Sequence, residues 1–250
     1  MRSRRVAVQE EATLKQTLSQ AIKGGFTDSP PAPMVSPRHL RRFVLIVAGI
    51  ALALLVQSRR SSVLAAPASK LPLYGALILA EMALAWFVTI GVRARGYRVA
   101  DVIGARRRTI FGGVLDLALA AGAVLLLHSS APILSRLLGS WSSNTGFLLP
   151  AARAESLAWV GVSLAAGACE EFVFRGYLQR QLWSITRHLP AALLLQSVIF
   201  GSGHLYQGWK PALITALYGL IFGLLAAWRR SILPGALGHA AADIVAGLRL

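Results

Sequence analysis

The sequence predicts an all-α integral membrane protein, a polytopic helix bundle with about seven to eight transmembrane helices. Of its 250 residues, 55% are hydrophobic and only 14% are charged, which is far from the balance of an average soluble domain. A net charge of +16 in a soluble protein would suggest nucleic acid as a partner. Here the basic residues bracket long apolar runs, so we exclude nucleic acid and expect membrane lipid as the partner.

Residues 1–37 precede the first apolar run, and they predict a disordered or amphipathic polar tail. Four prolines close to its end, Pro30, Pro31, Pro33 and Pro37, oppose a regular helix. The segment lacks the basic start, apolar run and small-residue cleavage site of a secretory leader. We therefore expect no removed leader.

Seven apolar stretches follow, and each predicts a membrane-spanning helix. Several are shorter than the roughly 20 residues that cross a hydrocarbon core of about 30 Å, so flanking residues or a thinner bilayer must complete them. The segment "APILSRLL" at 131–138 predicts a short interfacial helix, which would bring the total to eight. The seven stretches are 43–57, 71–92, 110–128, 154–174, 190–206, 211–228 and 232–248.

The basic residues predict the orientation in the membrane. If every stretch crosses, most Lys and Arg fall on one side, in the N-terminal flank, 93–108, 175–187 and Arg229-Arg230. The positive-inside rule makes this side cytoplasmic, with the N-terminus inside and, for seven spans, the C-terminus outside. Arginine greatly outnumbers lysine, and alanine and leucine are abundant, as in GC-rich bacterial genomes. We therefore expect a bacterial inner membrane.

A few ionisable residues lie within or at the ends of the apolar runs. A charge in hydrocarbon costs about 2.5 to 3.5 kcal/mol on insertion scales, so such residues are paired or functional. We expect an arginine or backbone partner for two of them, Glu81 and Asp116, and leave both out of the site. The others are Glu170, Glu171, Arg175, His204, His239 and Asp243.

The stretch "CEEFVFRG" at 169–176 places two acids together. Glu171 and Arg175 are four residues apart and share a helix face, with the acid first, which favours an ion pair. Glu170 is rotated by about 100° and lacks that partner. One interpretation is a structural pair with a spare acid. The other is that the pair locks the helix while Glu170 moves protons, since desolvation strengthens proton binding by a carboxylate.

Two histidines complete the set of candidate residues. His204 ends the stretch "FGSGH", where the glycines allow a neighbouring helix or a substrate backbone to approach. His239 and Asp243 are four residues apart and share a face, so the acid can orient the imidazole. Each feature alone is also typical of hydrogen-bonded core residues in membrane bundles.

Together the three sites resemble the motifs of a known family. The chain carries E-E-x-x-x-R at Glu170, Glu171 and Arg175, F-x-x-x-H at Phe200 and His204, and H-x-x-x-N/D at His239 and Asp243. In this order they resemble the CAAX protease and bacteriocin-processing family (CPBP, or Abi) of intramembrane endopeptidases, over roughly 154–248. The apolar runs predict N-terminal transmembrane helices over 38–150, after the tail, and the resemblance implies a catalytic membrane core over 151–250.

The resemblance also implies an activity, hydrolysis of a peptide bond in a membrane-associated or lipidated protein or peptide, as in CAAX or leader-peptide processing. Glu170 would act with His204 to activate water, and Glu171 with Arg175 would support the site. His239 with Asp243 would stabilise the oxyanion. Asp243 stands where many members have Asn, and an ionised Asp cannot donate to an oxyanion. Its expected role is to orient or charge His239, or to act while protonated.

Zinc is the alternative to a water activated by glutamate alone. One Glu, two His and one Asp compose a credible zinc set, so any metal would bind Glu170, His204, His239 and Asp243. The spacing leaves both mechanisms open. We expect no cofactor.

Three other interpretations are weaker. A cysteine protease would use Cys169 with His204, but a thiol beside two acids is a poor thiolate. A rhomboid-like serine protease would use Ser202 with His239, but its turn needs Gly where this chain has Phe200. A non-catalytic transporter or scaffold would use the buried acids and histidines as a proton path, but no repeat or pair of Pro-broken helices supports it.

Overall fold

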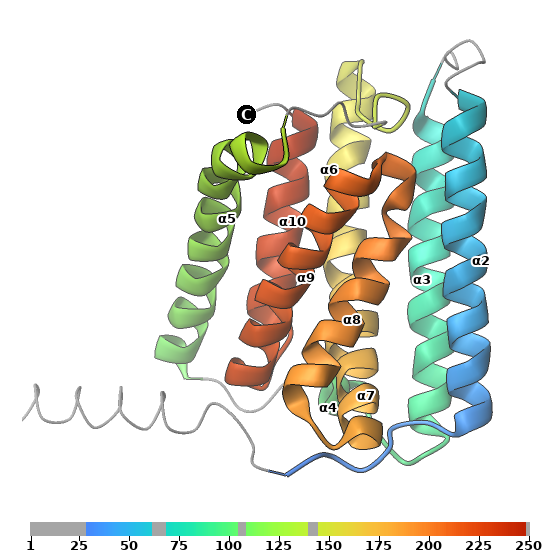
Figure 1. Cartoon of the computed structure of the whole chain (residues 1–250), viewed down its shortest axis with the longest axis vertical. Helices are drawn as coiled ribbons and strands as arrows, with labels where there is room; N and C mark the ends of the chain where they lie inside the picture. Colours follow the sequence, from blue (N-terminus) through green and yellow to red (C-terminus); the bar gives the residue numbers. More distant parts are fainter. Residues whose placement is uncertain (1–28, 62–68, 105–108, 140–144, 249–250) are drawn as a thin grey trace, which may run out of the picture.

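The computed structural model describes residues 29–61, 69–104, 109–139 and 145–248. In these ranges every regular element is helical, and Figure 1 shows the long helices side by side in one bundle. The predicted all-α class is confirmed. The elements are α2 (Pro37–Ser61), α3 (Leu71–Arg93), α4 (Val99–Ile103), α5 (Ile110–Leu138), α6 (Arg153–Glu170), the π-helix η1 (Glu171–Leu178), α7 (Gln179–Thr186), α8 (Leu189–Gly203), the 3-10 helix η2 (Leu205–Gln207), α9 (Trp209–Arg229) and α10 (Leu233–Leu248).

The helices have the lengths and surfaces of membrane spans. Five are long and apolar enough to cross a bilayer, namely Pro37–Arg59, Leu71–Arg93, Ile110–Leu138, Arg153–Thr186 and Trp209–Arg229. Two shorter apolar helices, Leu189–Gly203 and Leu233–Leu248, accompany them. Large apolar side chains face outward, such as Leu79 and Leu125, which are 69% and 67% exposed. These surfaces suit contact with lipid chains rather than water.

The short interfacial helix expected at 131–138 is not a separate element. This segment is the last part of α5, which continues through Pro132 to Leu138. A proline inside a helix removes one backbone hydrogen bond without necessarily ending the helix in a membrane. The described residues therefore contain no eighth apolar helix.

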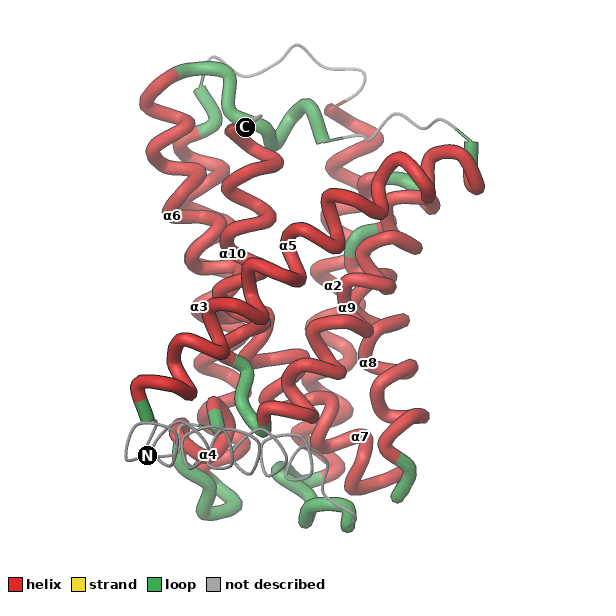
Figure 2. Tube along the Cα trace, turned by 90° about the vertical axis from the view of Figure 1, so that its left-hand side faces the viewer, coloured by secondary structure: helices red, strands yellow, loops and turns green. Residues whose placement is uncertain are grey.

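The chain runs up and down between two ends of the bundle. The N-terminal end is defined here as the end at which the described chain begins with residues 29–36, and Figure 1 and Figure 2 show the short helices α4 and α7 at this end. Arginines lie at or just after the ends of helices at the N-terminal end: Arg93 ends α3, Arg187 follows α7 and Arg229 ends α9. This distribution agrees with the basic side predicted from the sequence.

Tight turns connect the last helices. Arg187 and Arg230 adopt left-handed conformations, with φ of 57° and 52°, and end α7 and α9. The His188 side chain accepts a hydrogen bond from the Ala191 N–H at the start of α8. Such caps replace the missing helix hydrogen bonds and reverse the chain within a few residues. The turns place α8 against α7 and α10 against α9.

The described part of the predicted tail, residues 29–36, packs on the bundle. Met34 and Val35 are buried, and their N–H groups donate to Gln181 Oε1 at 2.7 and 3.1 Å. Tyr97 donates through its hydroxyl to the Ala32 carbonyl at 3.2 Å. These bonds attach the segment before α2 to α7 and to the loop between α3 and α4. Residues 1–28 of the predicted tail lie outside the described residues.

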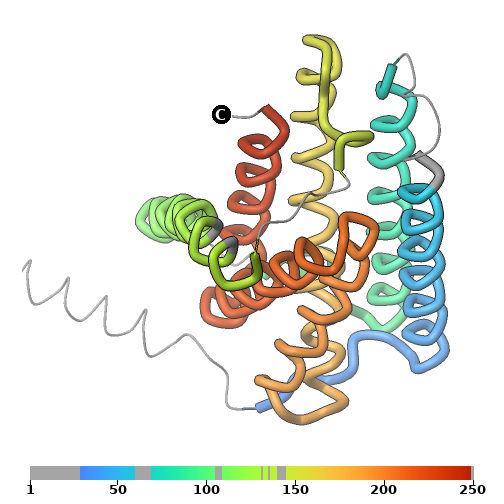
Figure 3. Tube along the Cα trace, turned by 45° about the horizontal axis from the view of Figure 1, so that its top comes forward, coloured from blue at the N-terminus to red at the C-terminus, as the bar shows by residue number. Residues whose placement is uncertain are grey.

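Two close helix contacts position the site. In the bundle, α6 packs between α3 and α10, and α5 packs on α10 (Figure 3). A Cβ at Gly167 of α6 would lie 2.7 Å from the Ala236 carbonyl of α10, and a Cβ at Gly201 of α8 would lie 2.6 Å from the Ala212 carbonyl of α9. Only glycine permits these approaches. They hold the end of α6 against α10 and the end of α8 against α9.

Candidate active site

Glu171 and Arg175 form the ion pair predicted from their spacing. Arg175 Nη1 lies 2.7 Å from Glu171 Oε1, and both side chains are fully buried. The guanidinium also lies 4.1 Å above the centroid of the Phe200 ring, a cation–π contact. The pair therefore links η1 to α8 in the interior of the bundle.

The helix carrying this pair is not a regular α-helix. Residues Glu171–Leu178 form a π-helix, which begins directly after Glu170, the last residue of α6. π-helical segments are rare and occur often at functional sites. Both adjacent glutamates reach His239, although neighbouring residues on a helix point about 100° apart.

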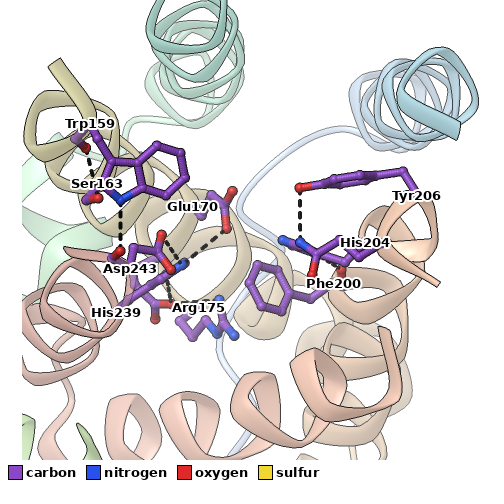
Figure 4. Close-up of polar contacts among 11 residues, drawn as sticks. Trp159, Ser163, Glu170, Arg175, Phe200, His204, Tyr206, His239 and Asp243 are labelled. Carbon is purple, nitrogen blue, oxygen red and sulfur yellow. Dashed lines mark hydrogen bonds and ion pairs between the residues drawn. The ribbon is translucent and has the colours of Figure 1, made fainter. Parts of the chain in front are cut away.

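His239 of α10 is the centre of the acid cluster. Its Nδ1 lies 3.2 Å from Glu171 Oε1, and its Nε2 lies 3.7 Å from Glu170 Oε2 and 3.6 Å from Asp243 Oδ2 (Figure 4). An ionised carboxylate can only accept, so Nδ1 carries the hydrogen that faces Glu171. Nε2 is then left between two carboxylates. The Phe222 ring stacks on the imidazole at 5.8 Å.

The three carboxylate side chains around His239 differ in how much of their surface is exposed. The Glu171 side chain is fully buried, whereas those of Glu170 and Asp243 are 15% and 37% exposed. Glu171 is also the acid that Arg175 neutralises. Of the two adjacent glutamates, Glu170 is therefore the one that water or a substrate can reach.

Asp243 pairs with His239 as its spacing predicted, and its backbone is held in place as well. The Asp243 carbonyl accepts a hydrogen bond from Trp159 Nε1 at 2.9 Å. The Ser163 hydroxyl donates in turn to the Trp159 carbonyl at 2.9 Å. The first bond joins α10 to α6 close to the cluster, and the second lies within α6.

His204 lies across the site from the acids. It follows the last residue of α8, and its Nδ1 lies 3.0 Å from the Phe200 carbonyl. A carbonyl can only accept, so Nδ1 carries a hydrogen and Nε2 of the neutral ring is an acceptor. Figure 4 shows His204 and Phe200 on one side, with Glu170, His239 and Asp243 on the other.

The predicted partnership of Glu170 with His204 is not a direct contact. Among the described residues no hydrogen bond or ion pair joins the two side chains; Glu170 contacts His239 instead. His204 is still close enough to act electrostatically on Asp243. The structure thus brings all the predicted residues to one site, but it assembles Glu170, Glu171 and Asp243 around His239 and sets His204 apart.

Glu81 of α3 is a site residue that the sequence analysis left out. Its carboxyl group lies within hydrogen-bonding range of Glu170 and electrostatic reach of Asp243. The expectation of an arginine or backbone partner was therefore wrong for Glu81. It was right for Asp116, whose Oδ1 lies 2.9 Å from Arg229 Nε. Both acids look alike in sequence, and only the packing of α3 on α6 separates them.

The four residues of the alternative zinc set are not gathered around one point. In the described part of the chain, no group of three or more His, Cys, Asp or Glu side chains could hold a metal ion. His239 is engaged by carboxylates on both ring nitrogens.

The alternative nucleophiles are not placed for catalysis. Ser202 is exposed, and its hydroxyl donates to the Ile199 carbonyl at 2.7 Å. Cys169 is a partly buried free thiol, and its described neighbours include the acids Glu81 and Glu170. Neither side chain forms a described hydrogen bond or ion pair with a histidine.

Three carboxylates around a histidine, held in a bundle of apolar helices of membrane-spanning length, form a candidate hydrolytic site. Residues 152–245 match the family model described as type II CAAX prenyl endopeptidase Rce1-like. This model represents the CPBP family, so the segment that spans almost all of α6 to α10 is similar to that family. The family supports an intramembrane endopeptidase with a protein or peptide substrate. No curated protein and no solved structure matches the chain.

Proposed function

We propose that the protein cleaves a peptide bond of a membrane-associated protein or peptide with a water molecule activated by Glu170. One observation carries this assignment. Glu170 is partly exposed and forms no ion pair with an arginine of the described residues, while the neighbouring Glu171 is buried and neutralised by Arg175. A carboxylate in this position can accept a proton from water at the edge of a low-dielectric site.

The residues divide the reaction as follows. Glu170 accepts a proton from the water as the water oxygen attacks the carbonyl carbon, while Nε2 of His204 orients the water as an acceptor. A new C–O bond forms, and the carbonyl oxygen gains negative charge. His239, with a proton on Nε2, donates to that oxygen. The C–N bond then breaks, and the proton held by Glu170 passes to the leaving amine.

The supporting residues hold His239. Glu171 binds the Nδ1–H group of His239, and Arg175 compensates the charge of Glu171. Asp243 orients the other ring nitrogen. This chemistry requires no metal ion, and the structure supports it through the arrangement of the side chains.

The substrate class follows from the family and from the membrane location. The matched description names CAAX prenyl endopeptidases, so we propose a lipidated protein or peptide that ends in a CAAX-like sequence as the first substrate to test. The arginines at the N-terminal end of the bundle support a cytoplasmic N-terminus. We assign the protein to a bacterial inner membrane.

The test uses the purified protein in liposomes and an internally quenched farnesylated peptide with a C-terminal CAAX sequence. Glu170→Gln keeps the shape of the side chain but removes the base, so kcat should fall by about 10² to 10⁴. Asp101→Asn is the matched control, because Asp101 caps α4 away from the site. Wild-type rates in Glu170→Gln would overturn the assignment of the base.

A second readout tests the substrate class. If the wild-type protein leaves the farnesylated peptide intact, the lipidated substrate is wrong. Protein termini in membranes of cells that express wild type or Glu170→Gln are then compared by mass spectrometry. New termini that depend on Glu170 would retain the peptidase function, and their absence would reject it.

A further inference from the structure

Tyr206 lies in the site but has no assigned role. It belongs to η2, the short 3-10 turn between α8 and α9. Figure 4 shows its ring beside His204, with the hydroxyl end directed toward the side of Glu170. The residue therefore faces the acid cluster from the side opposite His239.

Two aromatic contacts position the Tyr206 ring. It stacks on His204 with ring centroids 6.0 Å apart and an angle of 29° between the planes. The Phe147 ring meets it edge-on at 6.2 Å. A tyrosine held on two sides loses little further freedom when its hydroxyl binds a substrate.

The Tyr206 hydroxyl group accepts one hydrogen bond and keeps its own hydrogen available for donation. Gln207 Nε2 donates to Tyr206 Oη at 3.0 Å. An amide nitrogen cannot accept, so this bond leaves the hydroxyl hydrogen of Tyr206 for another acceptor. A phenol also keeps its proton at neutral pH.

The hydroxyl group is near the reacting region. Its phenol lies within electrostatic reach of the carboxyl groups of Glu170, Asp243 and Glu81. None of these acids can donate while ionised. His239 supplies Nε2 alone, since its Nδ1 is bound to Glu171. The site thus has few donors for a developing oxyanion, and Tyr206 provides one.

We propose that Tyr206 is a further catalytic residue, whose Oη–H group donates a hydrogen bond to the carbonyl oxygen of the scissile bond. The proposal rests on the proposed peptidase function. The oxygen is then bound between His239 on α10 and Tyr206 on η2, on opposite sides of the site. The bond strengthens as the oxygen gains charge, so it lowers the barrier more than it improves binding.

The test is Tyr206→Phe, which retains both ring contacts and removes only the hydroxyl. Loss of one oxyanion donor costs about 10² to 10³ in kcat, so we expect a fall of this size with KM within about twofold. Tyr218→Phe is the matched control, because that ring packs with Phe222 and the α5 side of the bundle. A kcat for Tyr206→Phe within about threefold of wild type, or a change in KM alone, would overturn the proposal.

Parallel measurement of Glu170→Gln separates the two proposals. An inactive Glu170→Gln with a fully active Tyr206→Phe rejects the role of Tyr206 and retains the peptidase mechanism. An active Glu170→Gln rejects the mechanism whatever Tyr206→Phe shows.

A further variant covers the case in which Tyr206→Phe does not fold. Replacement of Tyr206 by 3,5-difluorotyrosine keeps the hydroxyl but makes it more acidic. Activity should then fall at alkaline pH, where this phenol loses its proton and wild-type tyrosine retains it. An unchanged pH profile would contradict donation by Tyr206.

Discussion

Arg175 binds Glu171 and leaves Glu170 without a cation from its own helix: Arg175 Nη1 lies 2.7 Å from Glu171 Oε1, and both side chains are fully buried. The adjacent acids therefore have different environments, although they differ by one position in sequence. We assign a structural task to Glu171 and a chemical task to Glu170. We therefore expect replacement of Glu171 by Gln to lower stability and replacement of Glu170 by Gln to lower activity.

Glu171→Gln should destabilise the protein, because it leaves the buried Arg175 charge uncompensated. Removing one partner of a buried pair costs about 3 to 5 kcal/mol. We expect a lower thermal midpoint in detergent for Glu171→Gln than for Glu170→Gln. The double variant Glu171→Gln/Arg175→Met should recover part of the loss, because no lone charge remains. Equal midpoints for the two single Gln variants would contradict this division.

Glu81→Ala should lower kcat, because the Glu81 carboxyl group lies within hydrogen-bonding range of Glu170 and helps to hold that side chain in place. A misplaced catalytic group can cost up to about 10²-fold in rate, so we expect a fall of about 10-fold to 10²-fold in kcat with little change in KM. Asp116→Ala is the control, since Asp116 pairs with Arg229 outside the site. A kcat for Glu81→Ala within about twofold of wild type would show that the two acids do not interact during catalysis.

The two histidines should respond differently to substitution by alanine. His239→Ala removes the ring shared by Glu170, Glu171 and Asp243, so stability and activity should both fall. His204→Ala removes the ring that orients the attacking water in the proposed mechanism, so activity should fall by about 10² to 10⁴. Only one hydrogen bond within the protein is lost with it, the one to the Phe200 carbonyl, so stability should change little. Thermal unfolding and single-turnover cleavage of both variants measure this contrast. A stable, active His239→Ala would contradict the central position of this ring.

Cleavage by the wild-type protein should not depend on a metal ion. The described acids and histidines form no group that could hold one, and the proposed water activation uses Glu170 alone as base. We expect 1,10-phenanthroline to leave the rate unchanged, with no stoichiometric zinc in elemental analysis. Stoichiometric zinc whose removal abolishes cleavage, and whose return restores it, would replace this mechanism by a metal-dependent one.

Local spacing explains which parts of the site could be predicted. Glu171 with Arg175 and His239 with Asp243 are each four residues apart, so one helical turn places the members of each pair together whatever the rest of the chain does. Hydropathy located the apolar helices for a similar reason, because a bilayer requires a long apolar run for each span.

The relations between helices could not be obtained in this way. The contact of Glu81 with Glu170 depends on α3 packing against α6, and that of His239 with both glutamates depends on the close approach of α6 and α10 at Gly167. The π-helical winding of η1 also has no clear signal in "EFVFRGYL". Each of these features depends on how side chains from distant segments fit together.

The sequence by itself determined the membrane bundle, the three motifs and the two ion pairs within single helices, because all of these depend on composition and on spacing along one helix. Only the tertiary structure decided that His239 collects three carboxylates, that Glu81 joins Glu170, and that His204 and Tyr206 face them across the site. The physical reason is that the separation of side chains on different helices depends on where those helices cross, and the crossings depend on packing throughout the bundle.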